Sequence, residues 1–205
     1  MCDRIILRGD NVKISIGVSN RHVHLCESDF KTLFGEECAL EVVKKLSQPG
    51  EFASNCKVTL KTTKDVIENV RVVGPIRKYT QVEISKTDSF KLGLNPPVRD
   101  SGDLKGSLGI TIIGPKGEIN LDEGCIIATR HIHITPKEMK EYGFSGEEVS
   151  VRIDGEKGGI LNHVRLKVSD SYAFELHLDT DDANAFLVKS GDVATIIEED
   201  NIKKI

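Results

Sequence analysis

The 205-residue chain has no tryptophan, only 5% aromatic residues and no apolar run long enough to cross a membrane. Its five cysteines are odd in number and include no C-x-x-C pair, so reduced thiols fit better than a secreted disulfide framework. The net charge is only −4, with basic residues scattered among acidic ones. The composition therefore argues against nucleic-acid and membrane-surface binding, and an anionic substrate would need a local basic cluster.

Short runs rich in β-branched residues, separated by turn residues, dominate the sequence. Strands are predicted at 13–18, 57–62, 66–73, 80–85, 109–113, 125–129, 148–153, 164–168, 174–178 and 193–197. Gly-rich turns, as at 114–117 and 154–159, separate some of them. Many short strands with such turns are typical of barrels or sandwiches, so the sequence predicts a mainly β fold with a few short helices.

One phrase occurs twice: R-H-V-H-L at 21–25 and R-H-I-H-I at 130–134. A short helix is expected after each copy, and the second begins with a capping box at 135–138 that has proline at the first helical position. Further helices are predicted near Thr180 and over 38–46. The repeated unit of strand end, R-H-x-H and helix predicts two related subdomains packed together.

Four of the six histidines lie in these two phrases. Side chains alternate between the faces of a strand, so both imidazoles of an H-x-H point the same way and can grip one metal ion. Each pair needs a further ligand, and Glu83, mid-strand among apolar neighbours, and His177, at a strand end, are the candidates. His163, near a turn, is interpreted as an ordinary polar residue. The two predicted metal sites are His22, His24 and Glu83, and His131, His133 and His177.

Arginines supply candidates for anion binding. If the segment from Arg77 to Glu83 stays extended, Arg77, Tyr79, Gln81 and Glu83 share one face, and Arg77 presents a planar fork suited to phosphate beside the metal. Arg99, in a loop bounded by Pro and Gly, is a second candidate. For either arginine, the alternative is an ordinary surface ion pair.

Three other interpretations of the histidines compete with a two-metal enzyme. A single-metal cupin-like oxygenase or a metal-dependent hydrolase also combines H-x-H with a distant Glu and His on a β-barrel, although the duplicated phrase counts against the single site of a cupin. A non-catalytic metal-binding module is another alternative. Finally, the imidazoles could make hydrogen bonds only.

Several longer motifs, in this order along the chain, resemble the phosphate propanoyltransferase family, the PduL-type phosphate acyltransferases. The resemblance covers about residues 12–197. Its motifs are V-S-N-R-H-V-H-L, L-S-Q-P-G-E-F-A, T-Q-V-E-I-S-K-T-D-S-F-K-L-G, P-V-R-D-S-G-D-L-K-G-S, G-P-K-G, A-T-R-H-I-H-I-T-P and E-L-H-L-D-T-D-D-A-N-A.

The resemblance implies two β-barrels, a discontinuous one formed by 10–20 and 129–197 and an inserted one at 21–128, with a C-terminal tail at 198–205. It also implies reversible acyl transfer between coenzyme A and phosphate, with two divalent metal ions, usually Zn²⁺. The family's metal ligands match the six residues given above, and its phosphate-binding arginine, with a catalytic role, matches Arg77.

Acyl-CoA and phosphate are therefore the expected partners, and a homodimer is compatible with the sequence. Family members destined for bacterial microcompartments usually carry an amphipathic N-terminal extension, which is not evident in the dozen residues before the first matching strand. The expectation is a cytoplasmic enzyme that prefers acetyl-CoA over propanoyl-CoA.

Overall fold

The computed structural model describes residues 12–197, so the tail expected at 198–205 lies outside the described residues. Within this range the chain forms two compact units. The first unit combines residues 12–19 with 130–197, and the second unit is residues 20–129. Each unit has its own cluster of buried apolar side chains, so each is described by itself.

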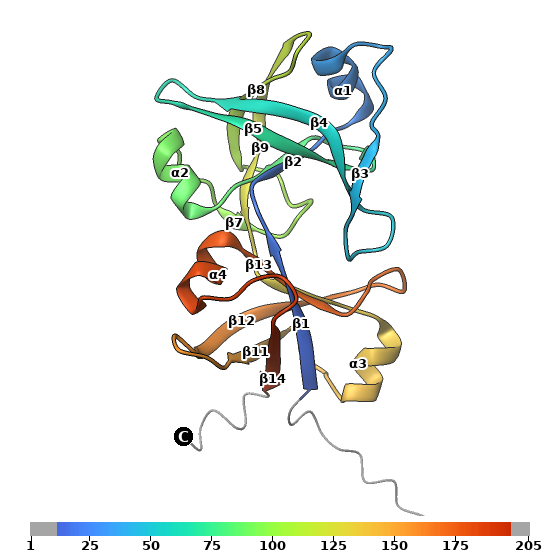
Figure 1. Cartoon of the computed structure of the whole chain (residues 1–205), viewed down its shortest axis with the longest axis vertical. Coiled ribbons are helices and arrows are strands. Elements are labelled where there is room, and N and C mark those ends of the chain that lie inside the picture. The colour runs from blue at the N-terminus through green and yellow to red at the C-terminus, as the bar shows by residue number, and fades with distance from the viewer. Residues whose placement is uncertain (1–11, 198–205) are drawn as a thin grey trace, which may run out of the picture. The chain divides into compact units, whose positions relative to one another are not determined.

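The first unit is a closed barrel of six strands (Figure 1). Around the barrel the strands are β1 (Val12–Ser19), β13 (Glu175–Asp179), β10 (His131–Ile134), β12 (Gly159–Val168), β11 (Glu148–Ile153) and β14 (Val193–Ile197). Helix α3 (Pro136–Tyr142) follows β10, and helix α4 (Thr180–Phe186) follows β13. Aliphatic side chains such as Ile16, Ile132 and Leu176, all with 0% exposure, form the core.

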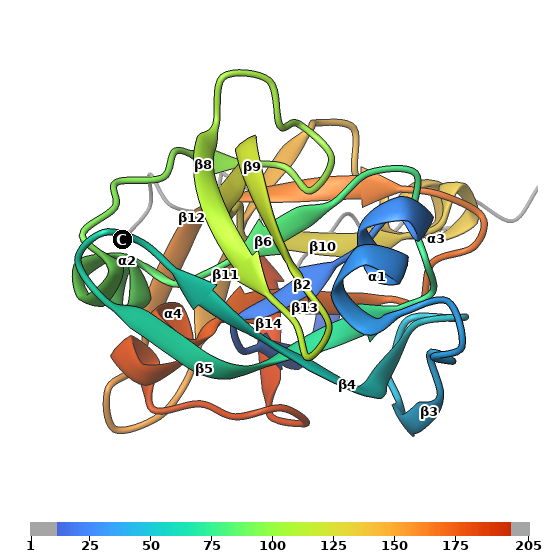
Figure 2. The ribbon, with the colours of Figure 1, turned by 90° about the horizontal axis from the view of Figure 1, so that it is seen from above.

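The second unit also closes on itself, because β8 pairs with both β4 and β9. Its ring consists of β4 (Phe52–Lys61), β5 (Val66–Gly74), β2 (His22–His24), β6 (Gln81–Glu83), β9 (Glu118–Ala128) and β8 (Leu108–Ile113). Strand β3 (Val42–Lys45) adds to β4, and β7 (Val98–Arg99) adds to β9. Helix α1 (Glu27–Phe34) follows β2, and α2 (Lys86–Leu92) follows β6. Figure 2 shows β8 and β9 as a long hairpin.

The predicted fold class is confirmed: the protein is mainly β, with short helices and two barrels. The two units also share a local arrangement. Strand β2 lies between the antiparallel β6 and the parallel β5, and β10 lies between the antiparallel β13 and the parallel β12. No helix among residues 12–197 is both long enough and apolar enough to span a membrane.

Two local predictions were wrong. Residues 38–46 were expected to be helical, but Val42–Lys45 form β3, which pairs with β4 across a turn containing Pro49 and Gly50. The β-branched Val42 and Val43 favour this extended form. The strand expected at 80–85 is shorter, because Ser85 is the N-cap of α2, and its side chain and that of Asp88 form a capping box that the prediction missed.

Candidate functional site

Alternation along β2 and β10 separates apolar from histidine side chains. Val23 and Ile132 are both 0% exposed and belong to the cores of their units. Since neighbouring residues of a strand face opposite ways, the two histidines that flank each of these residues lie on the other face of the sheet. The strand geometry therefore presents each H-x-H as a pair of imidazoles on one surface.

In the second unit, His22 and His24 lie next to Glu83. The antiparallel register of β2 and β6 places His22 directly opposite Glu83, and Nε2 of His22 is 3.5 Å from Oε2 of Glu83. The rings of His22 and His24 are 4.9 Å apart between centroids. One nitrogen or oxygen atom from each of the three residues lies within 4.8 Å of the others, which is close enough to share one ion.

Backbone carbonyls orient both imidazoles. Nδ1 of His22 is 2.9 Å from the carbonyl oxygen of Asn20, and Nδ1 of His24 is 3.1 Å from that of Val73. A carbonyl oxygen only accepts hydrogen bonds, so Nδ1 is the protonated nitrogen in these contacts. The lone pair of Nε2 is then available to a metal ion, in the arrangement that metal-binding histidines usually have.

In the first unit, the cluster consists of three histidines. The register of β10 and β13 places His131 opposite His177. The centroid of the His133 ring is 4.7 Å from that of His131 and 4.5 Å from that of His177. Tyr172 stacks on His133 at 4.0 Å, which limits the rotation of that imidazole. Ligand atoms of the three histidines again lie within 4.8 Å of one another.

The donor chemistry of both clusters fits a divalent transition-metal ion. Five imidazoles and one carboxylate suit Zn²⁺ and related ions, whereas Ca²⁺ and Mg²⁺ prefer oxygen ligands. Each cluster offers three protein ligands, so a tetrahedral ion held there would keep one coordination position open. The six residues predicted from the sequence are thus the two groups that the described part of the chain brings together in this way.

Glu175 and Gln81, each two positions before the third residue of a cluster, were not assigned a role from the sequence. Glu175 and His177 share one face of β13, and Oε2 of Glu175 is 3.0 Å from Nε2 of His177. A Cβ atom on Gly17 would lie 2.8 Å from the Glu175 carboxyl carbon, so glycine leaves room for this carboxylate. The equivalent Gln81 is fully buried and donates a hydrogen bond to Glu83. Both residues could have been identified from the sequence, because residues two apart on a strand share a face and each lies two positions before Glu83 or His177.

Arg77 is held in the second unit by two polar contacts. Its Nη2 is 2.9 Å from Oε1 of Glu51, and its Nη1 donates to Oγ of Ser101 at 3.3 Å. The extended segment expected from Arg77 to Glu83 does not form, because β6 contains only Gln81–Glu83 and Arg77 bridges to Cys26 instead. Arg77 is nevertheless connected to β6, since Gln81 donates to the same Ser101 hydroxyl at 2.8 Å.

Two other polar residues considered from the sequence lie beside carboxylates. The His163 side chain is 84% exposed and its Nδ1 is 2.9 Å from Glu148, as expected for an ordinary polar residue. Arg99, the second candidate for anion binding, lies in β7 with its Nε 3.8 Å from Asp103. Both partners of that pair are exposed, so the contact contributes little to stability.

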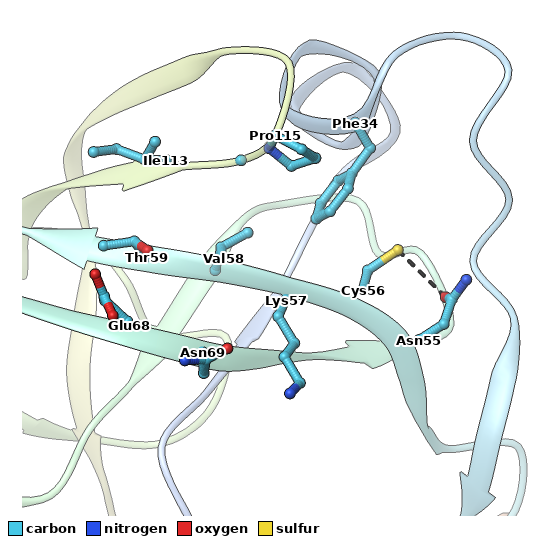
Figure 3. A pocket seen from close by; sticks show the side chains of 11 residues that line it. Phe34, Asn55, Cys56, Lys57, Val58, Thr59, Glu68, Asn69, Ile113 and Pro115 are labelled. Atoms are coloured by element: carbon cyan, nitrogen blue, oxygen red, sulfur yellow. Dashed lines mark hydrogen bonds between the residues drawn. The ribbon is translucent and has the colours of Figure 1, made fainter.

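The second unit also contains a hollow of about 540 Å³ over β4. Figure 3 shows its lining, with the Phe34 ring and Pro115 on one side and Lys57 and Thr59 on β4. None of the six predicted metal ligands and neither arginine candidate lines it. The hollow is therefore not part of the candidate site.

Burial sets the protonation state of His24, whose residue exposure is 3%. Desolvation lowers the pKa of His24 well below its ordinary value of 6.5, and the charges of His22 and Arg77 lower it further. The hydrogen bond to the Val73 carbonyl acts in the opposite direction, with a smaller effect. The imidazole is therefore neutral near pH 7, which is the form that binds metal.

Comparison with known proteins gives one consistent result. A family model described as phosphate propanoyltransferase matches residues 15–189. A phosphate propanoyltransferase of Thermotoga maritima is 51% identical over 187 residues, which are 90% of this chain and 89% of the relative. A protein of the same name from Rhodopseudomonas palustris is 44% identical, and the match covers 93% of this chain and 84% of the relative. Another from Priestia megaterium is 48% identical, and the match covers 89% of this chain and 85% of the relative.

We expect the stability of the metal-free protein to fall as the pH drops below about 6.5, because unfolded His24 then takes up a proton that the folded residue resists. The loss continues down to the lowered pKa of the folded state, with a slope of up to about 1.4 kcal/mol per pH unit for one group. Urea unfolding at several pH values measures it. His24→Gln should flatten the slope and the exposed His163→Gln should not; equal slopes in all three proteins would contradict the prediction.

Proposed function

This chain belongs to the phosphate propanoyltransferase family of acyltransferases, and we propose that it reversibly converts a short-chain acyl-CoA and inorganic phosphate into acyl phosphate and free CoA with the help of two bound divalent metal ions. The duplicated cluster of three ligands carries the proposal. A single-metal cupin-like oxygenase or hydrolase would need only one such cluster.

Zinc is the proposed ion at both clusters. Imidazole ligands suit Zn²⁺, and three protein ligands with an open position are typical of catalytic rather than structural zinc. The ligand residues are His22, His24 and Glu83 at one site and His131, His133 and His177 at the other. When bound there, the ions would supply Lewis-acid stabilisation for an oxyanion and for a thiolate.

Arg77 is the proposed phosphate-binding residue. Its planar guanidinium can form two parallel hydrogen bonds to phosphate oxygens. Glu51 and Ser101 hold the side chain in place, and its charge lies close enough to His24 to lower the pKa of that ligand. This supports a position for phosphate next to the His22 cluster.

The proposed chemistry is direct acyl transfer. A phosphate oxygen attacks the thioester carbonyl, the new carbon–oxygen bond forms, the carbon–sulfur bond breaks, and CoA leaves as the thiolate. Arg77 orients the attacking phosphate and offsets part of its charge. No protein nucleophile takes part, so both substrates must be bound together and the kinetics should be sequential.

The preferred substrate is proposed to be acetyl-CoA, with propanoyl-CoA as a slower alternative. The relatives compared above are named for the propanoyl group. One methylene in an apolar pocket changes the activation free energy by only about 1–3 kcal/mol, so both compounds should react. Cytoplasmic location and a homodimer stay predictions.

We expect thiol release from acetyl-CoA to depend on added phosphate, and Arg77→Ala to raise the phosphate KM by about tenfold or more because a charge-assisted contact is lost. Arg77→Lys should lose less, since the charge remains, and the exposed Arg152→Ala should match the unaltered protein. The measurement is initial rate against each substrate, repeated with propanoyl-CoA. Phosphate-independent release, or acylated protein formed without phosphate, would contradict direct transfer.

Elemental analysis tests the two metal sites separately. The purified protein should contain about two divalent ions per chain, and His22→Ala and His131→Ala should each contain about one, because each variant lacks one of three ligands. Both variants should lose phosphate-dependent thiol release, whereas the exposed His163→Ala should keep both ions and full activity. One ion per chain in the unaltered protein would favour the single-metal alternatives.

A further inference from the structure

We propose that two matched ion pairs, Arg21–Asp88 and Arg130–Asp182, are braces that hold the metal ligands of each cluster in register. The inference rests on the proposed two-metal function and adds four positioning residues to it. Nε of Arg21 is 2.9 Å from Oδ1 of Asp88, and Nη2 of Arg130 is 3.1 Å from Oδ1 of Asp182. Each pair lies within a single unit.

The braces occupy equivalent places in the two halves of the sequence. Each arginine directly precedes the first histidine ligand of its strand: Arg21 before His22, and Arg130 before His131. Each aspartate follows the third ligand at the same spacing, in E-I-S-K-T-D for Glu83 to Asp88 and H-L-D-T-D-D for His177 to Asp182. The repeat therefore extends beyond the histidines to their ion-pair partners.

The strand register shows what each brace connects. The pairing of β2 with β6 covers three residue pairs and ends at His22 opposite Glu83, and that of β10 with β13 ends at His131 opposite His177. In both cases the last pair consists of two metal ligands. The ion pair joins the two chain segments just beyond this pair, where the ladder of paired residues has ended. It is therefore positioned to keep the third ligand opposite the first.

Each aspartate is also fixed to the segment that carries the third ligand. Asp88 accepts a hydrogen bond from the backbone nitrogen of Ser85 through Oδ2, and its own backbone nitrogen donates to the Ser85 hydroxyl. Asp182 donates from its backbone nitrogen to the N-cap side chain of Asp179. Ser85 and Asp179 both lie two residues after the third ligand. Each brace thus fastens its arginine to a helix start that is rigidly connected to that ligand.

Burial separates these pairs from ordinary surface ion pairs. The side chain of Asp88 is 7% exposed and that of Asp182 is 22% exposed, and the arginines are 35% and 33% exposed. In the exposed pair Arg152–Asp154, the side chains are 44% and 68% exposed. Removing one partner of a partly buried pair leaves an unpaired charge, whereas an exposed pair contributes little.

The test measures metal affinity with one cluster at a time. His131→Ala leaves the His22 cluster and His22→Ala leaves the His131 cluster, so each background has one site to titrate with Zn²⁺ against a competing chelator. Asp88→Asn and Arg21→Gln should weaken binding in the His131→Ala background by about 10- to 100-fold, the usual effect of residues that support metal ligands. Asp182→Asn and Arg130→Gln should do the same in the His22→Ala background.

Matched controls separate positioning from general stability. In the His131→Ala background, Asp182→Asn should leave Zn²⁺ affinity unchanged, as should Asp88→Asn in the other background. Arg152→Gln should have no effect in either, and Arg21→Lys and Arg130→Lys should recover part of the affinity because the charge remains. Thermal unfolding of the metal-free variants shows whether each chain folds.

The outcomes distinguish the two proposals. If the unaltered protein binds two ions and the four variants that remove a brace keep the same Zn²⁺ affinity, the role of the braces is rejected. The proposed function is then unaffected. If the variants have a lower melting temperature without metal but an unchanged Zn²⁺ affinity, the ion pairs have only a structural role. This result also rejects their role in positioning metal ligands. An unaltered protein that binds no Zn²⁺ overturns both proposals.

Discussion

The alternation of side chains along two short strands is the constraint on which the candidate site depends. Val23 and Ile132 are committed to the apolar cores, so their histidine neighbours must face the other way. A slip of one residue would turn the apolar side chains out of the core and the imidazoles into it, so core packing and site geometry select the same register. The third residue of each cluster then follows from antiparallel pairing, which places Glu83 opposite His22 and His177 opposite His131.

The two clusters share this construction but differ in charge. With neutral imidazoles, Glu83 gives the His22 cluster one negative charge, whereas the His131 cluster has no charged ligand. The side chains that contact Glu83 and His177 differ in charge the other way round, because Gln81 next to Glu83 is neutral and Glu175 next to His177 is a carboxylate. Each cluster, taken together with this neighbouring residue, therefore contains one carboxylate: Glu83 belongs to the His22 cluster itself, whereas Glu175 lies next to His177.

The sequence predicted the parts of the site that follow from local patterns. Histidines two residues apart on a strand had to share a face, and Glu83 was conspicuous because a carboxylate lies among apolar neighbours. The course of the chain around Arg77 was not predictable in this way, because its bridge to Cys26 is a long-range contact. The helix expected over 38–46 failed for a similar reason: Val42 pairs with Ser54, and tertiary pairing outweighs weak helical preference. Helix α2 was missed although its capping box was readable in Ser85 and Asp88.

Hydrogen bonds connect Arg77, the proposed phosphate-binding residue, to Glu83, a proposed metal ligand of the same unit. The Ser101 hydroxyl contacts both Arg77 and Gln81, and Gln81 in turn donates to Glu83. A chain of hydrogen bonds therefore runs from the guanidinium to the Glu83 carboxylate. Glu51 already contacts Nη2 of Arg77, so a phosphate bound to Arg77 as proposed would have to share the guanidinium with this carboxylate or displace it.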